Sequence, residues 1–494
     1  MRAQLGAPAG GGTARAAQLP LSGRTAQQGS VATVQNPLPG GTQSVNTISS
    51  SVQVQGAYQG SVAPSVTPGP VLALSLADAI RRGLQYNLGA VSFQNSVRQA
   101  RAQRVVELAN LLPNINGNML VTEQQNNLAA FGFNFTLPVP GFSIPTIVGP
   151  FHYFDLRARL TQNVLNFTDL RNYRATEQLV RATDLSAQDA RDLIVLAVTG
   201  SYLSIVSASA RIDSARAQVV TAQAAYQQAV DRHDAGVAAR IDVTRSQVEL
   251  QTQQQRLTSQ ETDFAKQKIL LGRIIGLPPG QEFTLTDALP YAPVTGITLE
   301  QALQRASTTR ADLKAAQAQV QAADLTRKAA LAERYPSVDL AADYGVIGTS
   351  PQNSHGTFGV TGTLRFPIWQ GGRVRGDVDQ ADAALQQRRA EYEDLRGRVD
   401  AEVRQAFLDL TAAANQVSVA QSNRDLAQET LTQARDRFAA GVADTIEVIQ
   451  AQESVAAAEQ DYIGSTYAHN LAKATLARAM GQADQGIQQL LGRP

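Results

Sequence analysis

The chain has 494 residues, of which 43 are basic and 42 acidic, and it contains no cysteine. The absence of cysteine excludes disulfides, thiolate zinc sites, cysteine nucleophiles and a lipid-modified N-terminal cysteine. The near-zero net charge gives no support for bulk nucleic-acid binding. None of the 20 prolines falls within residues 151–277 or 368–493. Two such long stretches argue against an ordinary α/β enzyme built of short elements.

Residues 1–70 are rich in glycine, serine, threonine, glutamine and proline, and they show neither a helix nor a strand period. This composition predicts a disordered N-terminal extension. The segment has no apolar run of about 7–15 residues, so no secretory signal is visible in it. We expect that the start of the chain is assigned wrongly; a signal already removed and an intracellular protein are the alternatives.

Matching residues recur at nearly constant offsets along the rest of the chain, which indicates an internal duplication. The offset is 223 early in each copy and 205 later, as in Leu76 and Leu299, Pro113 and Pro336, Leu203 and Leu408, Gly236 and Gly441, and Gly276 and Gly481. We therefore expect a first structural repeat over 71–290, a second over 291–484 and a C-terminal tail over 485–494.

Each repeat is expected to begin with a helix that a proline ends. The first helix spans about 75–111 with Ser75 as its N-cap, and the second begins at Thr298. Pro113 and Pro336 stop these helices. Two strands follow each proline, at about 114–124 and 153–165, then 337–347 and 357–368.

Apolar and polar residues alternate along all four predicted strands, as in Val338, Leu340 and Ala342 between polar neighbours. Runs of about 9–11 such residues suit transmembrane β-strands. On the strand pattern alone, a soluble antiparallel sheet with one wet face remains an equal alternative.

Two long helices complete each repeat, at about 167–233 and 241–276, then 371–438 and 446–480. Along the third, apolar residues recur every three or four positions, which is coiled-coil spacing. A helix of about 67 residues is roughly 100 Å long at 1.5 Å per residue, so it must pack beside others in a bundle, coil or tube. Leu193–Ala210 is uncharged like a membrane span, but its equivalent, Arg398–Asn415, is charged. We expect a buried bundle helix instead.

Short glycine turns join the long helices, and acidic residues open the helices that follow. Glycine suits the left-handed position after a helix end, and an acidic residue favours the positive end of the helix dipole. The residues concerned are Gly236, Val237 and Asp242 in the first repeat, and Gly441, Val442 and Glu447 in the second.

This arrangement resembles the TolC-like outer-membrane efflux and secretion channel family over about 71–484. The resemblance is carried by the duplicated helix–strand–strand–helix–helix order, the matched turns and the strand-to-helix junction Phe366–Arg373. It implies a mainly α fold with transmembrane β. Long antiparallel helical hairpins form an α-barrel, and four strands per chain contribute to a trimeric 12-stranded β-barrel. Four strands cannot close a barrel, and open sheet edges are not tolerated in lipid, whereas twelve make an even-numbered barrel.

The resemblance implies an outer-membrane channel that extends into the periplasm, a passive exit duct of a tripartite efflux pump or type I secretion system, and no enzyme. The implied partners are two further copies in a homotrimer, a periplasmic adaptor protein, an inner-membrane transporter and outer-membrane lipid, with no nucleic acid and no cofactor. A periplasmic adaptor or a coiled-coil structural protein is the alternative. Adaptors normally carry one hairpin, and the proline-bounded strands oppose a scaffold.

In this family the hairpin tips form the periplasmic entrance and contact the adaptor, which assigns that contact to Gly236, Val237, Gly441 and Val442. Acidic residues just after the turns line the constriction, and Asp242 and Glu447 match them. Simple stabilisation of the helix N-termini is the alternative interpretation of both carboxylates.

The closing contacts of the family are only partly matched here. A second acidic residue of the pattern is replaced by Gln450, and a tyrosine and an arginine that help to lock the closed state are replaced by Phe438 and Ala443. We expect a different or weaker lock, unless Arg240 or Arg245 substitutes for the missing arginine.

Groups able to carry catalysis or bind metal are sparse. The four histidines lie far apart without metal-ligand spacing, so we expect them to face solvent: His152, His233, His355 and His469. We predict no catalytic residue and no metal site.

Overall fold

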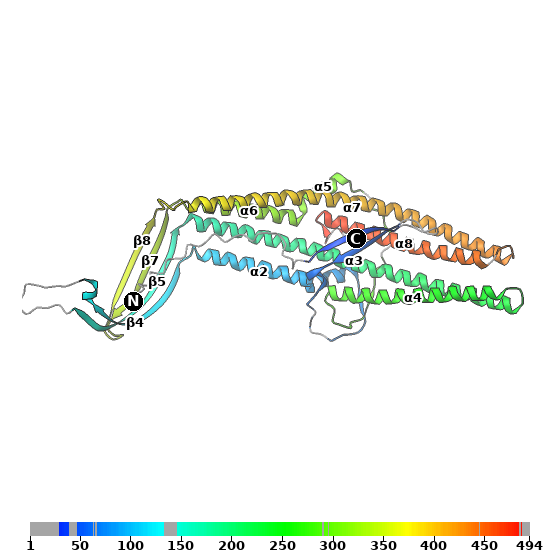
Figure 1. Ribbon diagram of the computed structural model, residues 1–494, viewed down its shortest axis with the longest axis horizontal. Coiled ribbons are helices and arrows are strands. Elements are labelled where there is room, and N and C mark those ends of the chain that lie inside the picture. Colours follow the sequence, from blue (N-terminus) through cyan, green and yellow to red (C-terminus); the bar gives the residue numbers. More distant parts are fainter. Residues whose placement is uncertain are drawn as a thin grey trace, which may run out of the picture. The chain divides into compact units, whose positions relative to one another are not determined.

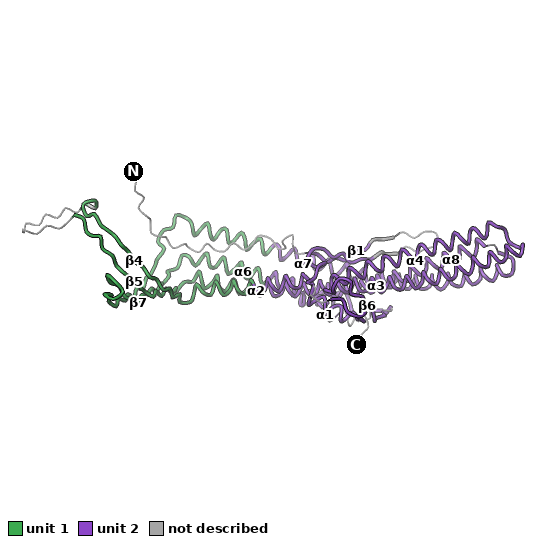
Figure 2. The backbone as a smooth tube through the Cα atoms, turned by 90° about the horizontal axis from the view of Figure 1, so that it is seen from below, with its two compact units in different colours: residues 1–19, 99–181, 318–389 green, residues 20–98, 182–317, 390–494 purple. Residues whose placement is uncertain are grey.

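The computed structural model describes residues 29–38, 47–62, 64, 67–132, 146–288, 291–294, 296–443, 445–483 and 486 (Figure 1). The chain forms two compact units (Figure 2). Among the described residues, unit 1 contains those within 99–181 and 318–389, and unit 2 contains those within 20–98, 182–317 and 390–494. Four helices run through both units: α2 (Leu88–Ala109), α3 (Phe167–Asp234), α6 (Ala311–Ala332) and α7 (Arg373–Ala439).

Unit 1 carries an antiparallel sheet of four strands in the order β4-β5-β7-β8. The strands are β4 (Asn114–Asn127), β5 (Ile147–Leu165), β7 (Ser337–Gly348) and β8 (Ser354–Arg365). All four lie where alternation predicted them, although β4 and β5 are longer, because their pairing continues to Asn127 and Ile147. The first short helical turn after β4 is η2 (Leu128–Phe131).

The register of this sheet separates an apolar face from a polar face. Met119 lies opposite Leu156 and Tyr344 opposite Phe358, whereas Arg157 lies on the other face and bonds Asp343 at 3.3 Å. Large apolar side chains of the first face are uncovered, since the exposed fractions of Met119, Tyr344 and Phe358 are 67%, 73% and 78%. This sheet therefore presents its apolar side outward.

The long helices form two antiparallel hairpins, α3 with α4 (Arg240–Ile274) and α7 with α8 (Thr445–Ala479) (Figure 1). The partners are matched, since α3 and α7 have 68 and 67 residues and α4 and α8 have 35 each. The seam predicted along α7 is buried at Val403, Ala406 and Val417. Small side chains at these positions allow close helix approach.

The first helix of each repeat is broken, which the sequence did not predict. The expected helix over 75–111 is two helices, α1 (Leu76–Tyr86) and α2, because Asn87 adopts an extended backbone. The Asn87 side chain is buried, where its Nδ2 donates to Tyr58 O at 2.8 Å and to Ile274 O at 3.2 Å. These long-range bonds outweigh the local preference for one helix. As predicted, Ser75 caps α1.

The equivalent break separates α5 (Leu299–Thr309) from α6 at Arg310, 223 residues after the first. The Arg310 guanidinium, which is buried, bonds Asp312 and Glu402, each at 2.6 Å. Arg478 binds Glu402 at 2.9 Å and Asp189 at 3.3 Å. The break thus lies in a network of two arginines and three carboxylates that joins α3, α7 and the end of α8.

The expectation of disorder over residues 1–70 is wrong for the described part of that segment. Antiparallel strands β1 (Val31–Leu38) and β2 (Thr47–Val54) form there, followed by η1 (Gly56–Gln59). A Cβ at Gly200 of α3 would collide with Val52, and one at Gly89 would lie 2.6 Å from the Tyr58 ring. This segment thus packs closely against glycines of two helices that are distant in the chain. The composition of the segment does not reveal these contacts. The predicted tail over 485–494 lies outside the described residues except for Gly486.

The core of unit 2 forms around the uncharged part of α3. Within the 18-residue segment from Leu193, Ile194 and Val198 are buried, and Tyr202 donates its hydroxyl to Leu74 O at 3.1 Å. Helix α3 holds an 18-residue window apolar enough for a membrane span, and 67% of that window is buried inside the protein. It packs as the predicted bundle helix, beside β3 (Leu72–Leu74) and its parallel partner β6 (Phe283–Leu285).

Candidate functional site

The two hairpin tips have the same backbone geometry. Gly236 and Gly441 have φ angles of +75° and +74°, in the left-handed region that glycine adopts most readily. Val237 N–H donates to Arg232 O at 2.9 Å, and Val442 N–H donates to Arg437 O at 3.0 Å. These are the six-to-one bonds of a Schellman motif, which satisfies the last carbonyls of each helix.

The tips present small and apolar groups to solvent. Val237 and Val442 have the same exposed fraction, 67%, although the residue directly after a Schellman glycine often packs against its own helix. A Cβ built on Gly236 or Gly441 meets no atom within 4 Å. The predicted contact residues are therefore accessible and lie at the two ends that a partner can reach.

The two predicted acidic residues occupy the first turns of α4 and α8 but have different surroundings. Asp242 lies 4.0 Å from Arg245 on its own helix. Glu447 reaches across its hairpin to Arg437 on α7 at 3.2 Å. Both positions permit the helix-dipole role, and the Glu447 pair also ties together the helices of its hairpin.

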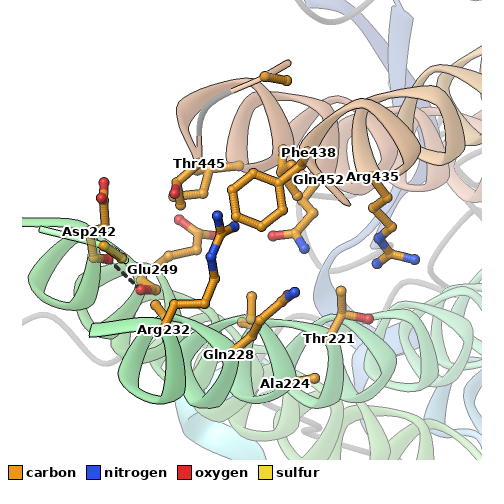
Figure 3. A pocket seen from close by; sticks show the side chains of 18 of the residues that line it. Thr221, Ala224, Gln228, Arg232, Asp242, Glu249, Arg435, Phe438, Thr445 and Gln452 are labelled. Atoms are coloured by element: carbon orange, nitrogen blue, oxygen red, sulfur yellow. Dashed lines mark hydrogen bonds between the residues drawn. The ribbon is translucent and has the colours of Figure 1, made fainter. Parts of the chain in front are cut away.

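A cavity of about 660 Å³ lies between the two hairpins just behind their tips (Figure 3). We call it the tip cavity; among its lining residues are Gln228, Arg232, Asp242, Glu249, Arg435 and Phe438. Residues of α3 and α4 form one wall, and residues of α7 and α8 form the other. Asp242 lies in the wall, whereas Glu447 and the exposed Gln450 are not among the lining residues. The structure therefore brings only part of the predicted constriction set together.

Arg232 makes the contact across the tip cavity that the sequence reasoning missed. Its guanidinium lies over the Phe438 ring, 4.5 Å from the ring centre, and thereby links α3 to α7 (Figure 3). Such a cation–π contact contributes roughly 0.5–1 kcal/mol at an exposed site and more when desolvated. Neither Arg240 nor Arg245 provides it. One sequence feature could have indicated this contact. Arg232 lies in the last helical turn before Gly236, and Phe438 lies in the last helical turn before the equivalent Gly441.

The histidines do not assemble into a site. Three of the four are exposed as expected: His152, His233 and His355. The expectation is wrong for His469, which is buried against Tyr291 with 4.8 Å between the ring centres. Within the described ranges, no three histidine, aspartate or glutamate side chains are grouped so that they could hold a metal ion. The tips instead offer charge, a narrow cavity and exposed valines, which suit gating and docking.

Comparison with known proteins identifies the family. A profile described as "Outer membrane efflux protein" matches residues 91–277 and 302–482. The chain belongs to this outer membrane efflux protein family. Family membership places the protein in the outer membrane, and it removes the adaptor and scaffold alternatives.

Curated and solved relatives agree with the family assignment. Outer membrane protein OprJ of Pseudomonas aeruginosa is 25% identical over 407 residues, 78% of this chain and 79% of OprJ. The cation efflux system protein CusC of Escherichia coli is 23% identical over 318 residues, 63% of this chain and 67% of CusC. The crystal structure of VceC from Vibrio cholerae superposes with a TM-score of 0.67 at 18% identity, covering 82% of this chain and 96% of VceC. This family fold contains the long helices and the four strands described above.

Proposed function

We propose that the protein is the outer-membrane exit duct of a tripartite efflux pump, a passive channel through which solutes leave the cell. The outward-facing apolar side of the four-stranded sheet carries this proposal. In a soluble protein that face would be buried, whereas in a bilayer it contacts lipid and the polar face lines a water-filled lumen. The printed names of relatives such as the toluene efflux pump outer membrane protein TtgF agree with efflux.

The assembly that we propose is a homotrimer. Strands β4 and β8 are the two edges of the sheet, and unpaired edges do not persist in hydrocarbon. Pairing β8 of one chain with β4 of the next closes a 12-stranded barrel when three chains contribute. The hairpins of the three chains then form an α-helical tunnel through the periplasm. The break at Arg310, 223 residues after that at Asn87, supports the internal duplication.

The partners that we propose meet the duct at the hairpin tips. A periplasmic adaptor contacts Gly236, Val237, Gly441 and Val442, because these positions combine exposed apolar side chains with an open backbone. An inner-membrane transporter supplies the energy through that adaptor. Asp242 and Glu447 contribute charge to the entrance, and the contact of Arg232 with Phe438 holds the two hairpins of one chain together in the closed state.

The membrane assignment is tested by two neighbouring residues of β8 that face opposite sides of the sheet. Val360 lies opposite Ala342 on the apolar face, and Thr361 lies opposite Ala341 on the polar face. We expect Val360→Arg to abolish insertion, because an arginine facing lipid near the bilayer centre costs about 2–4 kcal/mol. Thr361→Arg is the matched control and should insert. Outer-membrane fractionation followed by detergent extraction measures both variants.

Equal insertion of the two variants, or recovery of the unaltered chain in the soluble fraction as a rod-like dimer, would refute the channel. A conductance measurement on the extracted protein in planar bilayers completes the test. Thr361→Arg adds positive charge to the lumen, and we expect it to shift ion selectivity towards anions.

A further inference from the structure

A second cavity, of about 460 Å³, lies far from the hairpin tips, between β2, α3, α4 and α8. We call it the serine cavity, after the hydroxyls in its wall. Its polar lining includes Ser50, Ser201, Ser204, Ser207, Arg211 and Tyr467. All the residues that line it belong to unit 2 of one chain, so one chain alone forms the wall.

The lining of the serine cavity is rich in donors whose acceptors are missing. Arg211 Nε, Ser50 Oγ and Gln460 Nε2 are buried, and none has a hydrogen-bond partner within the described residues. The Ser50 side chain is among the buried polar groups of the chain, with 9% exposed. A buried donor without an acceptor costs roughly 1–3 kcal/mol, so three of them around one space indicate that an acceptor belongs there.

Several other arginines of unit 2 are paired with carboxylates. Arg310 and Arg478 are each bonded to carboxylates, and the exposed Arg216 on the same helix as Arg211 binds Glu261 at 3.0 Å. Among the described residues, no carboxylate pairs with Arg211. Burial lowers its pKa, and the nearby Tyr467 opposes this shift.

The other polar groups of the wall do not neutralise Arg211. Ser204 donates to Gln267 Oε1 at 3.0 Å, so that the oxygen of this amide is already used. Asp461 also lines the cavity, but it is engaged with another group of the protein. Burial raises the pKa of Tyr467 to about 12, which keeps the phenol protonated as a donor at neutral pH. The wall therefore offers the Arg211 guanidinium and several donors, beside the already engaged Asp461 carboxylate.

We infer that the serine cavity binds a small oxyanion, with the Arg211 guanidinium as the charged anchor and the serine hydroxyls as additional donors. The shared chemistry is a negative charge spread over two or more oxygens, as in a phosphate or a carboxylate, which arginine matches with paired N–H groups. The volume accommodates a phosphate that carries a short organic group. The elements that form the site include the N-terminal strand β2, so binding also fastens that strand to α3 and α8.

Equilibrium dialysis of radiolabelled inorganic phosphate against the detergent-solubilised full chain tests the inference, with chloride used to fix the ionic strength. We expect one saturable site per chain in the unaltered protein. Arg211→Gln should weaken phosphate binding roughly tenfold or more, as expected for the loss of a charge-assisted hydrogen bond. Arg216→Gln on the same helix is the matched control and should bind as the unaltered protein does.

Two further arms keep the test decisive. Arg211→Lys keeps the charge and the fold but loses the paired N–H groups, and it should bind with intermediate affinity. Competition by glycerol 3-phosphate and by acetate distinguishes a phosphate from a carboxylate source, and displacement by either supports the site. The absence of saturable binding, or equal binding by Arg211→Gln, overturns it. A third result would also overturn the inference: the unaltered chain binds no phosphate, and Arg211→Gln destabilises the trimer. Arg211 would then pair with a carboxylate of a neighbouring copy.

Discussion

His469 lies in surroundings that oppose its protonation. Its exposed fraction is 1%, its ring packs on Tyr291, and neither ring nitrogen has a hydrogen-bond partner among the described residues. Burial lowers the pKa of His469 to about 4, and the neighbouring Lys473 adds to this effect. Lys473 is itself buried, donates to Ala292 O, and has its pKa lowered to about 8 by burial.

The low pKa of His469 predicts loss of stability in mild acid. In the unfolded chain a histidine titrates near 6.5, so as pH falls from 6.5 to 4 the unfolded state takes up the proton before the folded state does. The stabilising effect is present above pH 6.5 and is lost as the pH approaches 4. We expect His469→Leu to reduce the difference in thermal unfolding temperature between pH 7 and pH 4.5, measured by circular dichroism.

The control for this prediction is His233→Leu, because His233 is exposed at the first hairpin tip and should leave the acid dependence unchanged. An identical pH dependence in His469→Leu and the unaltered chain would assign acid sensitivity to other groups, such as the carboxylates of the Arg310 network.

At the scale of elements, the N-terminal strand β2 packs closely against α3 at Gly200. Because a Cβ at Gly200 would collide with Val52, Gly200→Val should displace β2, and such overpacking typically costs about 1–3 kcal/mol. We expect proteinase K to cut within residues 29–62 much faster in this variant, with the fragments identified by mass spectrometry. Gly397→Val on α7 has the same change in helix propensity but meets no atom within 4 Å, and it should resist like the unaltered chain.

Equal cleavage in Gly200→Val and Gly397→Val would show that the strand does not depend on this contact. Strands β1 and β2 also illustrate what the sequence does not reveal. The close contact of β2 depends on Gly200 of α3, which is distant in the chain, and nothing in the described part of residues 29–62 alone distinguishes the strands from a linker.

The long helices and the four strands of unit 1 were predictable for local reasons. Hydrophobic spacing, absence of proline and matched glycine turns all lie within single elements, and the observed bounds of α3, α4, α7 and α8 are close to the predicted ones. The helix breaks were not predictable. Asn87 and Arg310 leave the helical backbone because of partners on other elements, Tyr58 and Ile274 for one and Glu402 for the other.

For the whole molecule, the entrance charges should govern ion flow. We expect replacement of both Asp242 and Glu447 by the neutral Asn and Gln to alter single-channel conductance in planar bilayers and to weaken block by multivalent cations, because rings of charge concentrate counter-ions. Asp263→Asn is the control; Asp263 is exposed on α4 and paired with Lys266, well away from the turn.

Unchanged conductance and block in the double variant would limit both carboxylates to stabilising their helix ends. Phe438→Leu in the same recordings tests the contact between Arg232 and Phe438 independently of the charges. The variant removes the ring under Arg232 and leaves every charge in place. We expect a higher open fraction in that variant, and no change would remove the contact from gating. The turns located the two carboxylates, and the family resemblance pointed to Phe438. The contact of Arg232 with Phe438 depends on the packing of two separate hairpins, which the sequence does not give.

The strand order of unit 1 also dictates a sequence of events in time. Strand β5 pairs with β7, so Leu160 lies opposite Ala342, and the whole first hairpin, β6 and the helices α5 and α6 separate them along the chain. Because closing so long a loop is slow compared with forming a local hairpin, β4 and β5 meet first and must wait for β7 and β8. During that interval the nascent sheet exposes Met119 and its apolar neighbours on an unfinished edge. The half-sheet therefore keeps an unpaired β5 edge until the rest of the chain has been delivered.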